Sequence, residues 1–315
     1  MNEFEFIDHF RGLFKTRVPD DVTVPNGDDC GVFSGYVITM DSMVEGVHFR
    51  RDWMSALDIG FRAVASNLSD IAAMGAMPHS FLVNIAIPAN EDPDFVSDIG
   101  RGMALLADAH DVYLMGGNVT ASMAGISITI TMIGRTGDNV LRRNGAKEGD
   151  FILISGPTGR ADIGRMVLEH GLNAATYPES VNRFRRPVPR LDLVDAILGL
   201  SGVTACIDIS DGLLADLGHL CQASKVGAIL ELDKVPLHRE IVMYADETGT
   251  DPFMPVLTGG EEYELIITAD PEAAQTLQED SGLVCIGRIK GDSGMKATNH
   301  GHSVELPEIR GWQHL

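Results

Sequence analysis

The sequence predicts an α/β protein with two domains, and three observations favour this fold class. The chain has 315 residues, 44% of them hydrophobic, so it can bury a large core and exceeds the usual length of one domain. Strand-like and helix-like segments alternate along the second half, which is typical of layered α/β proteins. A turn-rich stretch at residues 138–150 precedes this half. We therefore divide the chain into an amino-terminal domain, 1–140, and a carboxy-terminal domain, 141–315.

In the amino-terminal domain, apolar residues at helical spacing predict three helices, and runs rich in Val, Ile and Thr predict three strands. The expected helices are residues 4–14, 56–74 and 95–109, and the expected strands are 36–40, 80–87 and 125–133. In the last strand Ser127, Thr129 and Thr131 alternate with apolar residues, which indicates a half-buried strand. The segment 114–118, with two adjacent glycines, is expected to end a further strand in a turn.

In the carboxy-terminal domain, three strand-like runs each lead into a helix. The expected strands are 151–155, 204–209 and 263–268, and the expected helices follow Gly159, span 213–223 and follow Pro271. The turn at 156–159 opens a helix whose amide groups could face an anion. Gly259 and Gly260 predict a turn that leads acidic residues into the third strand.

Composition and charge exclude several classes of function. The chain has 24 Lys and Arg against 45 Asp and Glu, a formal net charge of −21, and no basic run opposes it, so we expect no nucleic-acid partner. No stretch is long enough to span a membrane, and the amino terminus lacks the pattern of a secretory signal. The four cysteines form no Cys-x-x-Cys pair, which removes zinc ribbons and thioredoxin-like motifs. We expect a cytoplasmic protein with no membrane contact.

The candidate functional residues are aspartates that lie beside apolar residues at turns, strand ends and helix starts. They are Asp28, Asp29, Asp41, Asp70, Asp208 and Asp211. An aspartate in or next to a buried strand loses solvation unless it is paired or bound to a metal, so several that converge would suggest a cation site. Oxygen ligands without Cys or His favour magnesium, manganese or calcium over zinc.

Each of these aspartates also has a purely structural explanation. Residues 28–29 follow an Asn-Gly pair and have turn composition. Asp208 or Ser210 could cap the helix expected at 213–223, and Asp70 could pair with Arg62. The chain has neither a P-loop motif nor a well-placed Gly-x-Gly-x-x-Gly motif, so these phosphate-binding folds receive no support.

Eight sequence blocks resemble those of a known family. They are Asn26-Gly-Asp-Asp-Cys30, Met40-Asp41, Gly46-Val-His-Phe49, Asn67-Leu-Ser-Asp-Ile-Ala-Ala-Met-Gly-Ala76, Gly116-Gly-Asn118, Leu141-Arg-Arg-Asn-Gly-Ala146, Ile207-Asp-Ile-Ser-Asp-Gly-Leu213 and Gly259-Gly-Glu-Glu-Tyr-Glu-Leu265. Their content and order resemble the thiamine-monophosphate kinases over nearly the whole chain. Related enzymes, such as aminoimidazole ribonucleotide synthetase and selenophosphate synthetase, share the superfamily's fold and part of its metal pattern.

The resemblance implies a fold, a reaction and a set of ligands. The fold would be aminoimidazole ribonucleotide synthetase-like, with an amino-terminal α/β domain whose sheet pairs with its twin in a homodimer and a carboxy-terminal α/β domain that completes the active site. The reaction would be the ATP-dependent phosphorylation of thiamine monophosphate to thiamine diphosphate, the last step of thiamine diphosphate biosynthesis. Several magnesium ions would bridge the phosphates in a direct in-line transfer.

By the same resemblance, the site residues fall into three groups. The metal ligands would be Asp29, Met40 through its backbone carbonyl, Asp41, Asp70, Asn118, Asp208 and Asp211, of which Asp29, Asp70, Asp208 and Asp211 form the catalytic set. The ATP contacts would be Gly117, Asn118, Arg143 and Ser210. The residues that shape the thiamine-phosphate pocket would be His48, Glu261 and Trp312.

The sequence also departs from the family pattern. Asn118 stands where Asp is often found, Met40 replaces a common Thr, and Glu262 stands where Asp is common. Outside the resemblance, a lone histidine such as His48 is more often a core residue, and Trp312 could simply pack the tail. Two alternatives stay open: another ATP-using enzyme of the superfamily, or a catalytically silent protein that binds thiamine phosphates or nucleotide.

Overall fold

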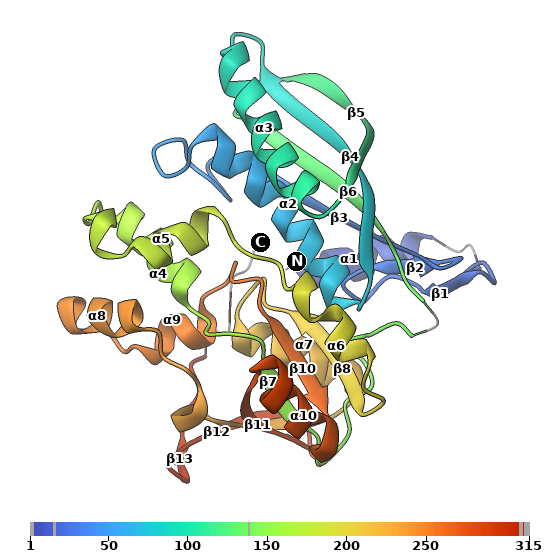
Figure 1. Cartoon of the computed structure of the whole chain (residues 1–315), viewed down its shortest axis with the longest axis vertical. Helices are drawn as coiled ribbons and strands as arrows, with labels where there is room; N and C mark the ends of the chain where they lie inside the picture. Colours follow the sequence, from blue (N-terminus) through green and yellow to red (C-terminus); the bar gives the residue numbers. More distant parts are fainter. Residues whose placement is uncertain (1–2, 15–16, 138, 309–310, 312–315) are drawn as a thin grey trace.

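The chain forms two β-sheets, each built mainly from one half of the sequence (Figure 1). This computed structural model describes residues 3–14, 17–137, 139–308 and 311. The first sheet has six strands in the order β1-β2-β3-β6-β4-β5, and the second has seven in the order β13-β12-β9-β11-β7-β10-β8. No described helix combines the length and the apolar character that a membrane span requires.

The first half supplies the six-stranded sheet and three helices. Its elements are α1 (Glu3–Leu13), β1 (Val22–Val24), β2 (Gly31–Phe33), β3 (Tyr36–Val44), α2 (Ala56–Ala73), β4 (Met77–Pro88), α3 (Pro93–Ala109), β5 (Tyr113–Ser122) and β6 (Ser127–Arg135). The sheet is antiparallel except for the parallel pair β4 and β5. A parallel pair needs a crossover, and α3 provides it.

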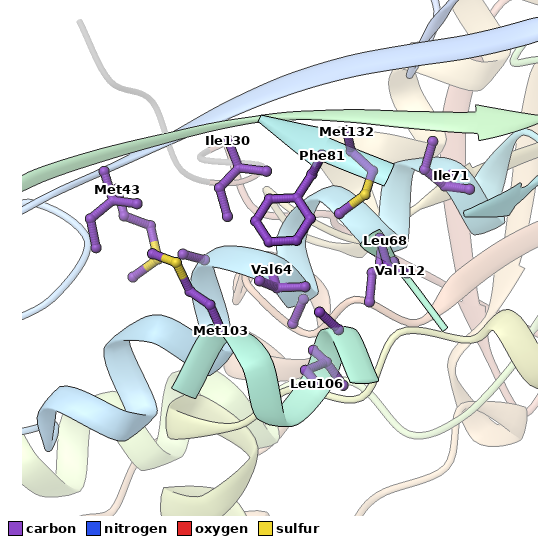
Figure 2. Packing of buried hydrophobic residues seen from close by; sticks show 14 of the residues in the cluster. Met43, Val64, Leu68, Ile71, Phe81, Met103, Leu106, Val112, Ile130 and Met132 are labelled. Carbon is purple, nitrogen blue, oxygen red and sulfur yellow. The ribbon is translucent and has the colours of Figure 1, made fainter. Parts of the chain in front are cut away.

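Helix α2 is the central element of this half, because it packs against the sheet, against α3 and against β8 of the second half. Val64 and Leu68 of α2 are buried between Ile130 of the sheet and Leu106 of α3 (Figure 2). A capping box starts the helix: the Ser55 hydroxyl accepts from the backbone N–H of residue 58, whose own side chain accepts from the backbone N–H of Ser55. The site residues carried by α2 are therefore held in a rigid frame.

The second half supplies the seven-stranded sheet and its covering helices. Its elements are β7 (Phe151–Ile154), α4 (Arg160–Glu169), η1 (Ala174–Thr176), α5 (Pro178–Arg185), η2 (Leu191–Leu193), α6 (Val194–Leu198), β8 (Val203–Asp208), α7 (Leu213–Ser224), β9 (Gly227–Glu231), η3 (Leu232–Lys234), α8 (Arg239–Thr248), α9 (Phe253–Thr258), β10 (Leu265–Ala269), α10 (Pro271–Ser281), β11 (Val284–Lys290), β12 (Gly294–Asn299) and β13 (His302–Val304). Every residue of β10 is buried, because helices cover both faces of the sheet. This explains why its sequence reads as a continuous apolar run.

The α/β fold class is confirmed, and the expected helices are confirmed within a residue or two of their ends. Three strand expectations are wrong, and β4 begins at Met77 rather than at residue 80. The segment 114–118 is not a turn but the middle of β5. Strand β3 continues to Val44, so Asp41 lies inside it, paired with Ile130. Strand β10 begins at Leu265, because Tyr263 has a positive φ of 55° and cannot continue an extended strand.

Candidate active site

A cavity of about 620 Å³ lies between the two halves of the chain. Strand β3, the loop after it and α2 form one wall, while α4, the end of β8 and the loop before β10 form the other. Six carboxylates line it: Asp41, Asp70, Asp162, Asp208, Asp211 and Glu261. A cavity with this lining suits cationic ligands or anions that arrive with metal ions.

Three of the predicted aspartates converge beside this cavity. Carboxylate oxygens of Asp29, Asp70 and Asp208 all lie within 4.8 Å of one another. They come from the loop before β2, the interior of α2 and the last residue of β8. The hydroxyl of Thr39 donates to Asp70 Oδ2 at 2.5 Å, and that of Ser69 donates to Asp208 Oδ2 at 2.6 Å. Neighbouring side chains thus fix the orientation of two of the three carboxylates.

The electrostatics of this cluster are unfavourable when no cation is bound. Burial, reinforced by the charge of Asp29, raises the pKa of Asp208 to about 8. Burial and the neighbouring aspartates raise the pKa of Asp70 well above its usual range. Burial also raises the pKa of Asp29, although the charge of Arg143 opposes this rise. Three buried carboxyl groups that repel one another would be stabilised by a multivalent cation, because its charge offsets that repulsion.

The residues present fit a hard divalent cation. Asp29 Oδ1 accepts from Arg143 Nε at 3.0 Å, whereas Asp29 Oδ2 is buried without any hydrogen-bond donor. A buried carboxylate oxygen without a partner is costly, and a metal ion would supply the missing partner. The cluster consists of oxygen donors alone, which favours magnesium, manganese or calcium over zinc.

Other predicted residues line the same cavity as Asp70 and Asp208. These are Asp41, His48, Ser210, Asp211 and Glu261. The Nδ1 atom of His48 accepts from the backbone N–H of Val44 at 3.1 Å. This bond closes the loop after β3 and holds the imidazole at the cavity wall.

The structure does not bring every predicted residue to this cavity. Gly117 and Asn118 lie in β5, where the Asn118 amide donates to Asn84 Oδ1 at 2.8 Å, and neither is a lining residue. Met40 lies in β3 with a largely exposed side chain. Trp312 lies outside the residues that the structure describes. The proposed roles of these four residues stay predictions.

The contacts in the structure test two structural explanations for the aspartates, namely capping of the helix at 213–223 and pairing with Arg62. Helix α7 is capped by Asp216, whose Oδ2 accepts from the backbone N–H of Asp211 and of Gly212, and not by Asp208 or Ser210. Arg62 pairs with Glu261 rather than with Asp70. Asp70 and Asp208 are therefore free of the pairing and capping roles that could have explained them, whereas Asp29 is paired with Arg143.

Several lining residues escaped the sequence analysis. Asp162 and Arg165 of α4 form an ion pair of 2.8 Å at the cavity wall, and their i,i+3 spacing resembles any surface pair on a helix. The backbone amide groups at the start of α4 do face an anion. This anion is a side chain of the protein itself, because Ala161 N–H donates to Glu262 Oε2 at 2.9 Å. No local pattern identifies either contact.

Comparison with known proteins assigns the fold and the site to one class. Residues 27–136 match "AIR synthase related protein, N-terminal domain" and residues 147–298 match "AIR synthase related protein, C-terminal domain". The chain is thus a two-domain protein of the AIR synthase-related class. It is 33% identical to thiamine-monophosphate kinase of Rhodopirellula baltica, over 93% of this chain and 91% of that one, and 34% identical to that of Haemophilus influenzae, over 100% and 98%. It belongs to the thiamine-monophosphate kinase family.

A solved structure supports the same assignment. AaThiL complexed with AMPPCP and TMP matches the chain with a TM-score of 0.87 at 29% identity, covering 100% of this chain and 97% of that one. The similarity therefore extends over both halves and includes the cavity between them.

Proposed function

We infer that this protein is an ATP-dependent kinase that phosphorylates thiamine monophosphate to thiamine diphosphate and releases ADP. Its relatives carry that activity in their names, and the matching structure holds an ATP analogue together with TMP. The observation that carries the proposal in this chain is the convergence of Asp29, Asp70 and Asp208 at a cavity shared by both halves. A kinase whose acceptor group is a phosphate needs such a cluster of carboxylates more than it needs a general base.

The chemistry explains this need. The attacking group is a phosphate oxygen, which is largely deprotonated near neutral pH because the second pKa of a phosphate monoester is about 6. The main barrier is the repulsion between two anionic phosphoryl groups that must meet in line. The acidic surroundings increase that repulsion, so positive charge must enter the site with the substrates.

We propose that magnesium ions would supply this charge and neutralise the phosphate groups. Asp29, Asp70 and Asp208 would hold them, together with Asp41 and Asp211 of the same cavity. The Met40 carbonyl and the Asn118 side chain would complete the set, as in the family pattern. The partnerless Oδ2 of Asp29 supports the assignment.

Arg143 is the residue that we assign to the ATP phosphates, together with Ser210, Gly117 and Asn118. Its guanidinium is already anchored to Asp29, and its backbone N–H donates to Asp28 Oδ1 at 3.0 Å. An arginine held in this way loses little conformational entropy when it binds a phosphate. It would therefore orient the transferred group beside the carboxylate cluster.

We assign the thiamine part of the acceptor to the region of His48 and Glu261, with Trp312 as a third contact. Glu261 lies at the cavity wall in the acidic loop before β10. The thiazolium ring is cationic, so a carboxylate there would attract it and disfavour neutral analogues.

We also propose a homodimer formed through the first sheet, with residues 1–140 serving nucleotide, metal and dimer contacts and residues 141–315 completing the site. β5 is an edge strand whose side chains are exposed along nearly its whole length, including Tyr113, Leu114, Met115 and Val119. An exposed apolar edge strand of this kind promotes aggregation unless a partner covers it.

The first experiment is phosphorus NMR of the purified protein with ATP, magnesium and thiamine monophosphate, with a chelated sample as control. We expect thiamine diphosphate and ADP to appear only when magnesium is present. If both substrates persist, calorimetry decides between the alternatives: binding without turnover identifies a silent thiamine-phosphate or nucleotide-binding protein. Absence of binding would contradict the assignment and point to another superfamily substrate.

A further inference from the structure

Arg62 is a buried cation that the proposed reaction does not use. It lies in the middle of α2 with only 1% of its surface exposed. Its Nη1 donates to the backbone carbonyl of Phe184 at 2.7 Å, and its guanidinium lies 4.5 Å from the centre of the Phe184 ring. A side chain from the first half is thus fixed to α5 of the second half by a hydrogen bond and a cation–π contact.

The remaining partner of Arg62 is Glu261, whose Oε1 forms an ion pair with Nη2. Glu261 has a φ of +62°, a left-handed conformation that costs a non-glycine residue free energy. Its backbone N–H donates to the Ser210 carbonyl at 2.7 Å, which ties the strained loop to the end of β8. The side chain itself is 29% exposed and faces the cavity.

The two other glutamates of this loop are held by different arginines and do not line the cavity. Glu262 pairs with Arg160 and Arg183, and Glu264 pairs with Arg183 and Arg190. Glu262 and Glu264 are almost completely buried. Within the described part of the chain, Arg62 is the cation that pairs with Glu261. Among the described side chains, Arg62 is therefore the one that pairs with the glutamate of this loop that lines the cavity.

We propose that Arg62 is a positioning residue for the acceptor: it fixes the Glu261 carboxylate at the cavity wall and ties its position to the packing of α2 against α5. The inference rests on the proposed function, in which Glu261 contacts the thiamine part of the substrate. A buried guanidinium requires a counter-charge, and Glu261 provides it through an ion pair, although Arg62 Nη2 makes no hydrogen bond. A carboxylate held in place before the substrate arrives binds it without an added ordering cost.

The experiment measures steady-state kinetics of Arg62→Lys, Glu261→Gln and the double variant. Lysine keeps the charge but lacks the planar fork that serves Phe184 and Glu261 together. In Arg62→Lys we expect the KM for thiamine monophosphate to rise about tenfold, because binding remote from the reacting phosphates is lost. We expect kcat and the KM for ATP to stay within about twofold. In the Glu261→Gln background, Arg62→Lys should add less than about a twofold change.

Arg186→Lys is the matched control. Arg186 also joins α5 to α2, through Asp58 at the start of that helix, but it does not reach the cavity. Its replacement should leave the KM for thiamine monophosphate unchanged. If Arg62→Lys fails to fold by circular dichroism, Phe184→Leu removes the ring beneath the guanidinium and should raise the same KM.

The outcomes separate this inference from the proposed function. A wild-type protein that makes no thiamine diphosphate contradicts the proposed function. An active wild type overturns the inference if Arg62→Lys, or Phe184→Leu in its place, keeps the wild-type KM. Equal losses of kcat in every background, or additive effects in the double variant, would also overturn it, because a merely structural arginine would behave in that way.

Discussion

Asp208 carries the sharpest prediction at the scale of a single residue. Its carboxylate is 2% exposed and has a pKa raised to about 8 by burial and by Asp29. Asp208→Asn keeps the size of the side chain and the acceptor for Ser69, but removes a buried acid that must take up a proton on folding near neutral pH because its pKa is about 8. Without metal, we expect the variant to melt about 2–4 °C higher, roughly a gain of 1 kcal/mol at this chain length.

The same substitution should remove function. We expect kcat to fall by more than about 100-fold, because a carboxylate that would hold the proposed cation is lost. Magnesium should raise the Tm of the wild type but hardly that of the variant, since binding to the native state is what stabilises it. Asp280→Asn, an exposed change on α10, serves as the control. A variant that turns over normally would refute the metal role of Asp208.

The sequence could predict which residues converge but not all of their partners. Asp29, Asp70 and Asp208 stand out because each lies beside apolar residues, and that setting demands a partner. The pairing of Arg62 with Glu261 is invisible in the sequence, because it joins distant segments from the two halves. The anion at the start of α4 likewise comes from Glu262, far along the chain.

At the scale of elements, the contact between α2 and α3 depends on two glycines. A Cβ on Gly60 would lie 1.9 Å from the Ile99 carbonyl oxygen, and one on Gly102 would lie 2.0 Å from that of Leu57. Gly60→Ala must therefore push the helices apart, and we expect a loss of about 1–3 kcal/mol in the free energy of unfolding. Urea denaturation measures this loss.

Gly100→Ala, on the partner helix α3, is the matched control. A Cβ at Gly100 meets no atom within 4 Å, so alanine should stabilise α3 by about 0.5–1 kcal/mol through its higher helix propensity. Equal denaturation midpoints for Gly60→Ala and Gly100→Ala would contradict the close packing of the two helices.

Strands β5 and β6, the last two strands of the first sheet along the chain, show what the hydrophobic pattern can and cannot predict. β6 alternates buried Ile128 and Ile130 with half-buried threonines, because helices cover one face only, and its sequence predicts it well. β5 is exposed along most of its length and has no such alternation. From the sequence alone, its two adjacent glycines indicate a turn. In the structure, however, a Cβ at Gly117 would lie 2.1 Å from the Val83 carbonyl oxygen. Close approach to β4 is the reason for that glycine.

At the scale of the whole molecule, the exposed β5 edge predicts self-association. We expect sedimentation at micromolar concentration to give twice the chain mass of 33.9 kDa. Val119→Glu would place like charges opposite each other across a two-fold interface and should shift the mass toward the monomer. Val188→Glu, at an exposed position outside the first sheet, should leave it unchanged. A wild-type mass near that of one chain would contradict the dimer.

The three clustered carboxylates also have a consequence for how the chain acquires and keeps its structure. Asp29, Asp70 and Asp208 belong to segments that meet only when α2 docks on β8, a contact of long sequence separation that we expect to form late in folding. A cation cannot be captured before that docking, so it has no part in the nucleus of folding. Magnesium bound there would therefore slow unfolding of the native protein and leave the folding rate unchanged. The metal that the proposed chemistry requires would thus also increase the kinetic stability of the native state.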